Sequence, residues 1–191
     1  SLFLEVVVAE GFEDEAREVL AAKPDLRLLE DPTITRPTTV ALEARAAGGG
    51  VLLMTADVES DDPAPWRTVT QREPTASELT DLGFAWRVAR HVKSNAIVLA
   101  RDRAIVGVGA GQMNRVQSAR LAVEQAGERA QGAVCASDAF FPFPDGVETC
   151  LTAGVTAVVE PGGSRKDDEV IAAVDAAGAA MVFTGRRHFR H

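Results

Sequence analysis

The hydrophobic pattern is most regular in the second half of the chain. Apolar side chains recur at helical spacing over residues 75–91, Leu82 and Trp86 among them, and the segment starts with Thr-Ala-Ser-Glu, which is typical of a capping box. Beyond this helix, short apolar runs alternate with amphipathic segments. We predict strands at 95–100, 105–108, 133–136, 155–159 and 180–183, and helices near 114–128, 145–153 and 167–177.

This alternation predicts the fold class. Strands that alternate with helices through short Gly and Pro loops imply right-handed crossovers and a largely parallel sheet covered by helices. A hairpin is expected around Asp102, between the first two strands of this half. The second half is therefore predicted to be an α/β domain of repeating strand–helix units.

The first 74 residues have a weaker pattern. A strand at 2–8, a helix from Phe12 and a strand at 26–29 precede a stretch rich in proline, glycine and acids, with further strands around 40–42 and 51–54. We expect residues 1–74 to form an N-terminal α/β segment with an irregular connector, continuing a domain truncated upstream. Residues 75–191 form the C-terminal α/β part. A chain that opens directly on a strand suggests a fragment of a longer polypeptide.

Composition narrows the possible partners. The chain has 191 residues, of which 46% are hydrophobic, and a formal net charge of -8. Binding to nucleic acid or to an anionic membrane is therefore disfavoured, and an anion must bind in a local pocket.

The sequence shows no signal peptide and no apolar run of the ~20 residues that a membrane span needs. Cys135 and Cys150 lack metal-ligand spacing, and we interpret them as reduced structural thiols of a cytoplasmic protein.

A glycine-rich loop at 107–111, GVGAG, separates a predicted strand from a predicted helix. Its backbone could approach an anion closely, and Gln112, Asn114 and Arg115 directly after it favour a polar ligand. Neither the dinucleotide-binding fingerprint nor a Walker motif is present. The alternative is a tight turn that lets the helix pack closely against the strand.

An aromatic segment at 137–143, SDAFFPF, follows the strand at 133–136, at the edge where open α/β sheets bind ligands. A flat heterocycle could stack on its phenylalanines, or they could fill a hydrophobic seam. Asn95, at the start of a buried strand, offers an amide that both donates and accepts. The three histidines and two cysteines form no catalytic or zinc-binding pattern. The residues alone thus predict a phosphate- or heterocycle-binding α/β domain.

Six segments, taken in order, resemble a known enzyme family. They are VKSNAIVL, VGVGAGQMNR, ASDAFFPF, DGVE, EPGGS and FTGRRHFRH. Together they resemble the C-terminal part of the formyltransferase region of the bifunctional AICAR transformylase and IMP cyclohydrolase family of purine biosynthesis. The resemblance is strong from about residue 84 to residue 191 and weaker from Phe3. The sequence departs from the family pattern at Pro144, where a basic residue is usual, and at Arg186, where an apolar one is usual.

The resemblance implies a reaction. In this family the 5-amino group of AICAR, an aminoimidazole carboxamide ribonucleotide, attacks the formyl carbon of 10-formyltetrahydrofolate. A Lys-His pair in a Lys-His-x-Asn-Pro-Cys-Gly motif assists the proton transfers. This chain lacks both that motif and the cyclohydrolase domain. The expectation is a part of an AICAR transformylase, inactive alone, from a parent that is also an IMP cyclohydrolase. The alternative is a non-catalytic α/β domain that binds a purine nucleotide or folate.

The resemblance also assigns site residues. Asn95 matches the family's active-site asparagine, at the reacting amine and carboxamide, and is the expected catalytic residue. Phe140 would stack near the imidazole ring of AICAR, and Arg187 would pair with its phosphate or nearby oxygens. The positions that match the folate side are Val116, Pro142, Phe143 and Asp145. A monovalent cation such as K⁺ would be held by Ser94, Asp138 and His191.

The implied fold is a cytidine-deaminase-like three-layer α/β sandwich, half of a duplicated transformylase domain, with a mostly parallel sheet and without the deaminase zinc. The implied partners are AICAR, folate, the missing N-terminal half of the same polypeptide and a second copy, because the family is a homodimer. No nucleic acid or membrane is expected as a partner.

Overall fold

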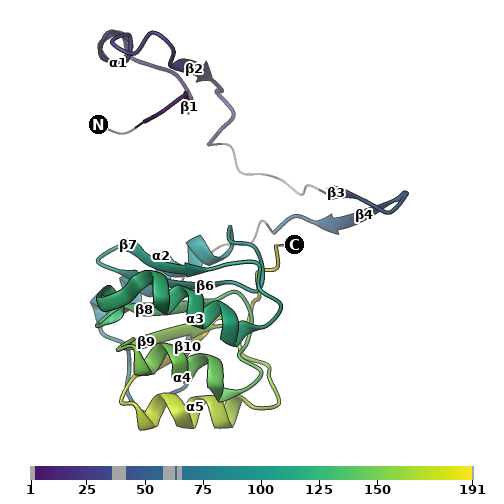
Figure 1. Cartoon of the computed structure of the whole chain (residues 1–191), viewed down its shortest axis with the longest axis vertical. Helices are drawn as coiled ribbons and strands as arrows, with labels where there is room; N and C mark the ends of the chain where they lie inside the picture. Colours follow the sequence, from purple (N-terminus) through teal and green to yellow (C-terminus); the bar gives the residue numbers. More distant parts are fainter. Residues whose placement is uncertain (1–2, 36–41, 58–62, 64–65, 191) are drawn as a thin grey trace. The chain divides into compact units, whose positions relative to one another are not determined.

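The computed structural model describes residues 3–35, 42–57, 63 and 66–190. The chain forms two compact units, Ser1–Val58 and Glu59–His191 (Figure 1). The sequence pattern placed a boundary after residue 74, at the end of the proline-rich stretch. The predicted strand positions 2, 40 and 41 and the candidate cation ligand His191 lie outside the described residues.

The first unit contains a parallel strand pair. β1 (Val6–Ala9) and β2 (Arg27–Glu30) are joined through the short helix α1 (Asp14–Leu20) and pair in parallel. The predicted strand, helix and strand are thus confirmed in order. Two acids in the first turn of α1, Asp14 and Glu15, suit the positive end of the helix dipole.

A separate hairpin completes the first unit. β3 (Leu42–Ala47) and β4 (Gly50–Thr55) pair antiparallel across a turn at Gly48 and Gly49. Both glycines have positive φ, 52° and 89°, the backbone region that the favoured two-residue hairpin turns require.

The second unit is built on a six-stranded sheet of order β5-β10-β9-β8-β6-β7. Its elements are β5 (Arg67–Thr68), α2 (Ala76–Ala89), β6 (Ile97–Arg101), β7 (Ala104–Gly109), α3 (Arg115–Ala126), the 3₁₀ helix η1 (Gly127–Ala130), β8 (Val134–Ser137), α4 (Pro144–Thr152), β9 (Ala157–Glu160), α5 (Asp167–Ala176) and β10 (Ala180–Phe183).

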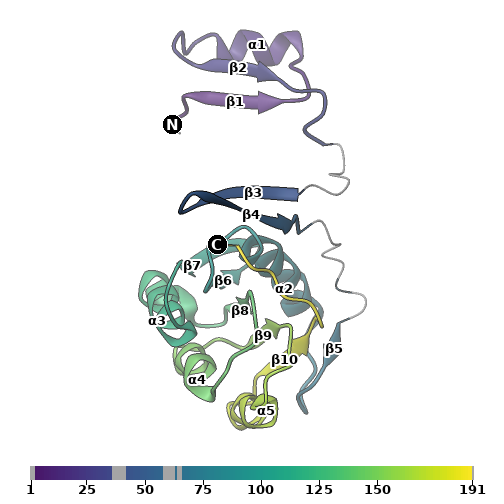
Figure 2. The ribbon, with the colours of Figure 1, turned by 90° about the vertical axis from the view of Figure 1, so that its right-hand side faces the viewer.

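Helices cover both faces of this sheet. Figure 2 shows α2 on one face and α3, α4 and α5 on the other. Successive residues of a strand point to opposite faces, so Val98 packs with the α2 cluster, whereas Ile97 and Leu99 pack with the cluster under α3 to α5. The second unit is therefore a three-layer α/β/α structure, and the α/β prediction is confirmed.

The sheet is parallel at its centre and mixed at its edges. β8, β9 and β10 pair in parallel, while β6 is antiparallel to both β7 and β8, and β5 is antiparallel to β10. The predicted hairpin at Asp102 accounts for the reversal of β6, since Asp102 and Arg103 form a two-residue turn with φ of 55° and 57°.

The capping box predicted for the second half begins α2. The hydroxyl of Thr75 accepts the N–H of Glu78, and the Glu78 carboxylate accepts the N–H of Thr75. Arg72 pairs with the same carboxylate at 2.9 Å and ties this helix start to the preceding loop. In the part of the chain that the structure describes, no helix has the length and apolar character needed to cross a membrane.

Candidate functional site

A pocket of about 300 Å³ opens where the loop before β6 meets the loops after β7 and β8. These loops share one edge of the sheet because β6 runs opposite to both neighbours. Loops at the carboxyl ends of parallel strands are the usual ligand sites of open α/β sheets. The lining residues come from four separate segments: Asn95, Met113, Asn114, Arg115, Ala139, Phe140, Pro142, Arg187 and Phe189.

Asn95 is half-buried and its amide is fixed on both sides. Its Nδ2 donates to the carbonyl oxygen of Gln112 at 2.8 Å, and its Oδ1 accepts from Nη2 of Arg115 at 2.9 Å. Its backbone carbonyl accepts from the hydroxyl of Ser118 at 2.7 Å. A carboxamide has two donor hydrogens and two acceptor lone pairs, and the side-chain contacts with Gln112 and Arg115 use one of each. Asn95 is therefore preorganised to donate to and accept from a ligand.

Arg115 forms a buried ion pair beside Asn95. It follows Asn114, whose side chain caps α3 by accepting the N–H of Gln117 at 2.9 Å. The guanidinium, 6% exposed, donates to Asp138 Oδ1 at 2.5 Å and to the Ser137 hydroxyl at 2.9 Å. Asp138 itself is fully buried. A buried pair of this kind fixes geometry, because breaking it would leave a charge without compensation in the core.

Two of the three expected cation ligands, Ser94 and Asp138, are in direct contact. Ser94 donates its hydroxyl to Asp138 Oδ2 at 2.6 Å and accepts the N–H of Arg190 at 3.1 Å. Oδ1 of Asp138 is paired with Arg115. The third expected ligand, His191, lies outside the described residues. Within those residues, no group of three or more His, Cys, Asp or Glu could hold a metal ion.

The aromatic segment divides between pocket and core. Phe140 and Pro142 line the pocket, whereas Phe141 is fully buried in the core under α3 to α5. Phe143 lies outside the pocket lining and is 57% exposed. Both interpretations of SDAFFPF thus hold, for different residues: one phenylalanine fills the core and the other presents a ring to the pocket.

The C-terminal segment reaches the pocket through a buried anchor. The N–H of His188 donates to the carbonyl oxygen of Asp138 at 2.8 Å, and its ring packs on Trp86 at 4.5 Å between centroids. The residues on either side, Arg187 and Phe189, line the pocket. The Arg187 guanidinium lies 4.8 Å from the Phe189 ring centroid, a cation–π distance. The basic tail of the chain therefore contributes one cation to the pocket.

The pocket does not collect every expected site residue. Asn95, Phe140 and Arg187, assigned to AICAR, all line it, as does Pro142 from the folate set. Val116 lies in the first turn of α3 and is outside the pocket lining.

The remaining folate candidate, Asp145, lies in the first turn of α4, where its carboxylate accepts the N–H of Gly146 at 2.8 Å. Like Val116 and Phe143, it does not line the pocket.

The glycine-rich loop serves packing. A Cβ on Gly107 would lie 2.0 Å from the carbonyl oxygen of Ala122, and one on Gly109 would lie 1.8 Å from that of Ser118. Both glycines thus let α3 approach β7, which is the alternative that the sequence left open. No residue of 107–111 lines the pocket, whereas the polar residues Asn114 and Arg115 after it do.

Two lining residues, Met113 and Ala139, were not predicted from the sequence. Met113 is 97% exposed and belongs to no apolar pattern, and Ala139 is too small to stand out.

The two cysteines are free and buried in the core, as expected. Their sulfur atoms are 3.9 Å apart. Hydrogen bonding to Cys150 and burial raise the pKa of the Cys135 thiol well above its ordinary value, so this thiol stays protonated and unreactive. Neither cysteine lines the pocket.

Known proteins resemble the chain along its whole length. Bifunctional purine biosynthesis protein PurH of Synechococcus sp. (strain CC9605) is 56% identical over 100% of this chain and 37% of that protein. PurH of Prochlorococcus marinus (strain MIT 9313) is 55% identical over 100% of the chain and 37% of that protein. PurH of Synechocystis sp. (strain ATCC 27184 / PCC 6803 / Kazusa) is 49% identical over 99% of this chain and 37% of that protein. The chain thus spans a little over a third of the length of these curated relatives.

Solved structures resemble it less. Acinetobacter baumannii RibD, form 2, is 19% identical, with 53% of this chain and 32% of that chain covered and a TM-score of 0.38. That score is too low to carry an argument about the fold.

The family model for the AICARFT/IMPCHase bienzyme matches residues 1–125, which is more than half of the chain. This match shows that the chain belongs to the AICARFT/IMPCHase bienzyme family, in agreement with the PurH relatives that resemble it along its full length.

Proposed function

We propose that this chain carries the substrate-binding part of an AICAR transformylase, which transfers a formyl group from 10-formyltetrahydrofolate to AICAR in de novo purine biosynthesis. The parent protein would also be an IMP cyclohydrolase. One observation carries the proposal: Asn95, Phe140 and Arg187, far apart in the sequence, line one pocket. Each supplies what a different part of AICAR needs.

The AICAR side of the pocket combines three kinds of contact. The Phe140 ring offers a stacking surface to the imidazole ring. The Asn95 amide, with one donor and one acceptor position to spare, would bind the amine and carboxamide. Arg187 would pair with the phosphate, as guanidinium groups commonly do. A pocket of about 300 Å³ suits a small ligand and leaves folate to bind largely outside it.

Folate is proposed to bind along the rim of the pocket next to Phe140. Pro142 lines this side, and the half-exposed Phe143 continues the apolar surface toward the start of α4. Asp145 in the first turn of that helix would face the pterin ring, and Val116 in α3 would complete the folate side. This arrangement would bring the formyl carbon to the amine held by Asn95.

The lining residues can orient this reaction but cannot accept its proton. The amine nitrogen bonds to the formyl carbon, the bond from that carbon to the folate nitrogen breaks, and a proton passes from the amine to the folate nitrogen. The described lining comprises Asn, Met, Arg, Ala, Phe and Pro side chains, none a base at neutral pH. The family's Lys-His pair would supply the proton transfers from a part of the enzyme that is not in this sequence.

The absence of a base also favours a second candidate, a domain that binds a purine nucleotide without chemistry. The two candidates predict the same AICAR binding and differ in turnover. Recovery of formyl transfer when the Lys-His half is supplied would exclude the binding-only function.

The fold and assembly complete the proposal. We propose that the second unit is half of a cytidine-deaminase-like domain pair, supported by its layers: α2 covers one face of the sheet, and α3, α4 and α5 cover the other (Figure 2). Self-association is also proposed, supported by the exposed apolar side chains of the β3–β4 hairpin.

The test is AICAR binding by calorimetry, followed by tetrahydrofolate release from 10-formyltetrahydrofolate. Release is measured with the chain alone and with the Lys-His half added in trans. We expect binding, little or no turnover alone, and turnover on addition, because loss of general acid–base catalysis costs ~10²- to 10⁴-fold. No AICAR binding, even with both halves present, would refute the proposed function.

A further inference from the structure

Glu160 is a buried carboxyl group directly behind the aromatic loop of the pocket. It is the last residue of β9 and is 0% exposed. Its Oε2 accepts a hydrogen bond from the backbone N–H of Phe141 at 2.7 Å. Its Oε1 has no hydrogen-bond partner among the described residues. The proposed chemistry does not use this group, so its position needs another explanation.

The hydrogen bond from Phe141 fixes the backbone that carries a pocket residue. The N–H of Phe141 and the carbonyl of Phe140 belong to one planar peptide unit. The Phe141 ring is locked in the core, while the Phe140 ring lines the pocket. Glu160 therefore holds the peptide from which the Phe140 ring projects.

The surroundings of Glu160 keep it neutral. The charged groups that act on it are Asp167 of α5 and Arg115 of α3, and Arg115 is already paired with Asp138. Burial, together with the Asp167 charge, raises the pKa of Glu160 to about 8, against the opposing effects of the Phe141 N–H, of Arg115 and of the Gly162 backbone.

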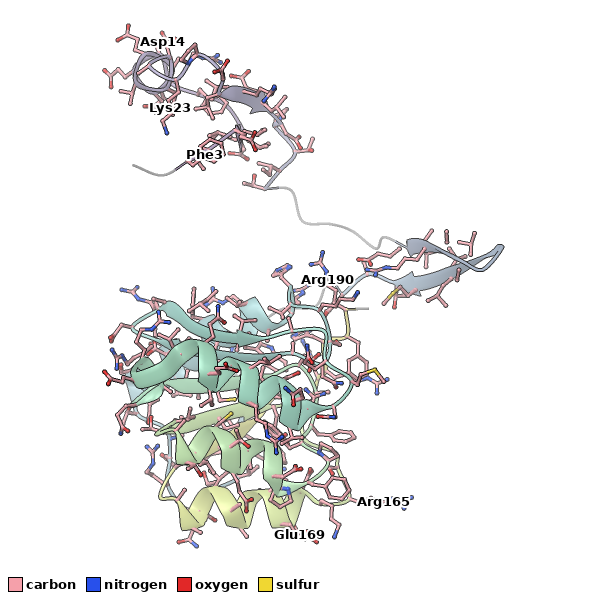
Figure 3. All side chains as sticks on the ribbon, viewed as in Figure 1. Phe3, Asp14, Lys23, Arg165, Glu169 and Arg190 are labelled. Carbon is pink, nitrogen blue, oxygen red and sulfur yellow. The ribbon has the colours of Figure 1, made fainter. Side chains whose placement is uncertain are left out.

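Three other ionisable groups of this region do not supply a countercharge, and Lys166, next to Asp167, is paired with Glu169. The Cys135 thiol on β8, which also interacts with Glu160, has a raised pKa and stays neutral. Arg165 and Glu169 are exposed and project outward from the unit (Figure 3). An ionised Glu160 would thus be a buried anion close to the Asp167 carboxylate, with only the Phe141 N–H and a weaker backbone interaction at Gly162 to stabilise it. Moving or admitting water would relieve this unfavourable state.

We infer that Glu160 is a positioning residue of the pocket: as a neutral carboxyl group it holds the Phe140–Phe141 peptide, and its ionisation displaces the Phe140 ring. Ligand binding then weakens in alkaline solution through a group that never touches the ligand. The effect on AICAR rests on the proposed function, whereas the effect on the peptide does not.

The first experiment needs no ligand. The side-chain ¹³C signal of Glu160 and the amide signal of Phe141 are followed by NMR from about pH 5 to about pH 9.5 in the unmodified chain and in Glu160→Gln. We expect both signals to titrate together near pH 8, and the Phe141 step to vanish in Glu160→Gln. Titration of Glu160 in the ordinary carboxyl range would overturn the inference, and so would a Phe141 amide signal that does not change when Glu160 titrates. The titration of the unmodified chain tests the inference even if the variant does not fold.

The second experiment measures the AICAR dissociation constant over the same range for the unmodified chain and Glu160→Gln. Ionisation of AICAR affects both proteins equally, so their ratio isolates Glu160. We expect affinity relative to the variant to fall about tenfold per pH unit above about pH 8. Glu169→Gln, which removes an exposed carboxylate of α5, should follow the unmodified chain. Identical profiles for the chain and Glu160→Gln would overturn the inference. AICAR binding to neither protein would instead count against the proposed function, and the NMR titration would still decide the role of Glu160.

Discussion

Arg115 determines which way the amide of Asn95 points. Its Nη2 donates to Oδ1 of Asn95 at 2.9 Å, so the amide nitrogen faces the carbonyl oxygen of Gln112. The same guanidinium is paired with the buried Asp138. The orientation of a pocket residue is therefore coupled to an ion pair in the core, and the ion pair can be tested through stability.

Replacing Arg115 with Met should destabilise the second unit strongly. The change leaves the Asp138 carboxylate buried without its cation, and breaking such a pair by removing one partner typically costs ~3–5 kcal/mol. Urea unfolding would measure the loss. The double variant Arg115→Met/Asp138→Asn should recover part of it, because the uncompensated charge is gone. A single-variant loss below ~1 kcal/mol would contradict this account.

Replacing Arg187 with Ala should weaken the binding of AICAR but not that of its nucleoside, which lacks the phosphate. A hydrogen bond to a charged group contributes ~1.5–3 kcal/mol, equivalent to about 10- to 150-fold in the dissociation constant. Calorimetry with both ligands separates a phosphate contact from a general effect on the pocket. The control is Arg186→Ala, because Arg186 is exposed and does not line the pocket. An equal loss for both ligands would exclude Arg187 as the phosphate contact.

The hydrophobic pattern was sufficient to predict most elements of the second unit. The strand predicted at 180–183 has those bounds, and the one predicted at 133–136 is shifted by one residue. Both could be predicted because short buried runs of β-branched residues and alanine between loops have few other structures open to them. Strand β5 was missed since a two-residue strand carries no periodicity. Its antiparallel pairing with β10 depends on tertiary contacts.

The site was less predictable because spacing does not show what a residue approaches. Gly107 and Gly109 have the composition of an anion-binding loop, yet they are needed for contact between β7 and α3. Glu160 looks like an ordinary strand end in the sequence, and only the fold shows that it is buried behind Phe141.

Replacing Gly109 with Ala should disturb Asn95 without touching the pocket. The new Cβ would lie 1.8 Å from the Ser118 carbonyl oxygen, so α3 must shift, and the Ser118 hydroxyl holds the Asn95 backbone carbonyl. Overpacking of this kind typically costs ~1–3 kcal/mol. The temperature of thermal unfolding and the affinity for AICAR should both fall. The open position Gly178 is unsuitable as a control because its φ is +67°, whereas Gly11, with nothing within 4 Å and no positive φ, is suitable. A Gly109→Ala variant as stable as Gly11→Ala would contradict the prediction.

The β3–β4 hairpin should promote self-association of this chain. Leu42, Val51, Leu52 and Leu53 are all more than half exposed, and an isolated two-stranded hairpin is marginally stable in water. Sedimentation velocity should show concentration-dependent association. The double variant Val51→Thr/Leu53→Thr, which keeps β-forming side chains on one face, should reduce it, whereas Ala47→Thr, on the opposite face, should not. Association that is unchanged in the double variant would place the interface elsewhere.

Glu160 should make the stability of the second unit fall as pH rises. Its pKa is raised from 4.5 to about 8 in the folded protein, so between these values the folded chain keeps a proton that the unfolded chain has lost. Stability from this group is complete below the unfolded pKa and declines by ~1.4 kcal/mol per pH unit until the folded pKa is reached.

Urea unfolding of the unmodified chain and of Glu160→Gln at several pH values in this window gives the difference directly, because other titrating groups are common to both. As pH rises, the free energy of unfolding of Glu160→Gln should increase steadily relative to that of the unmodified chain, and the difference should become constant above about pH 8. A difference that does not vary with pH would mean that the Glu160 carboxyl group is ionised in the folded protein, and its neutral role behind Phe141 would be wrong.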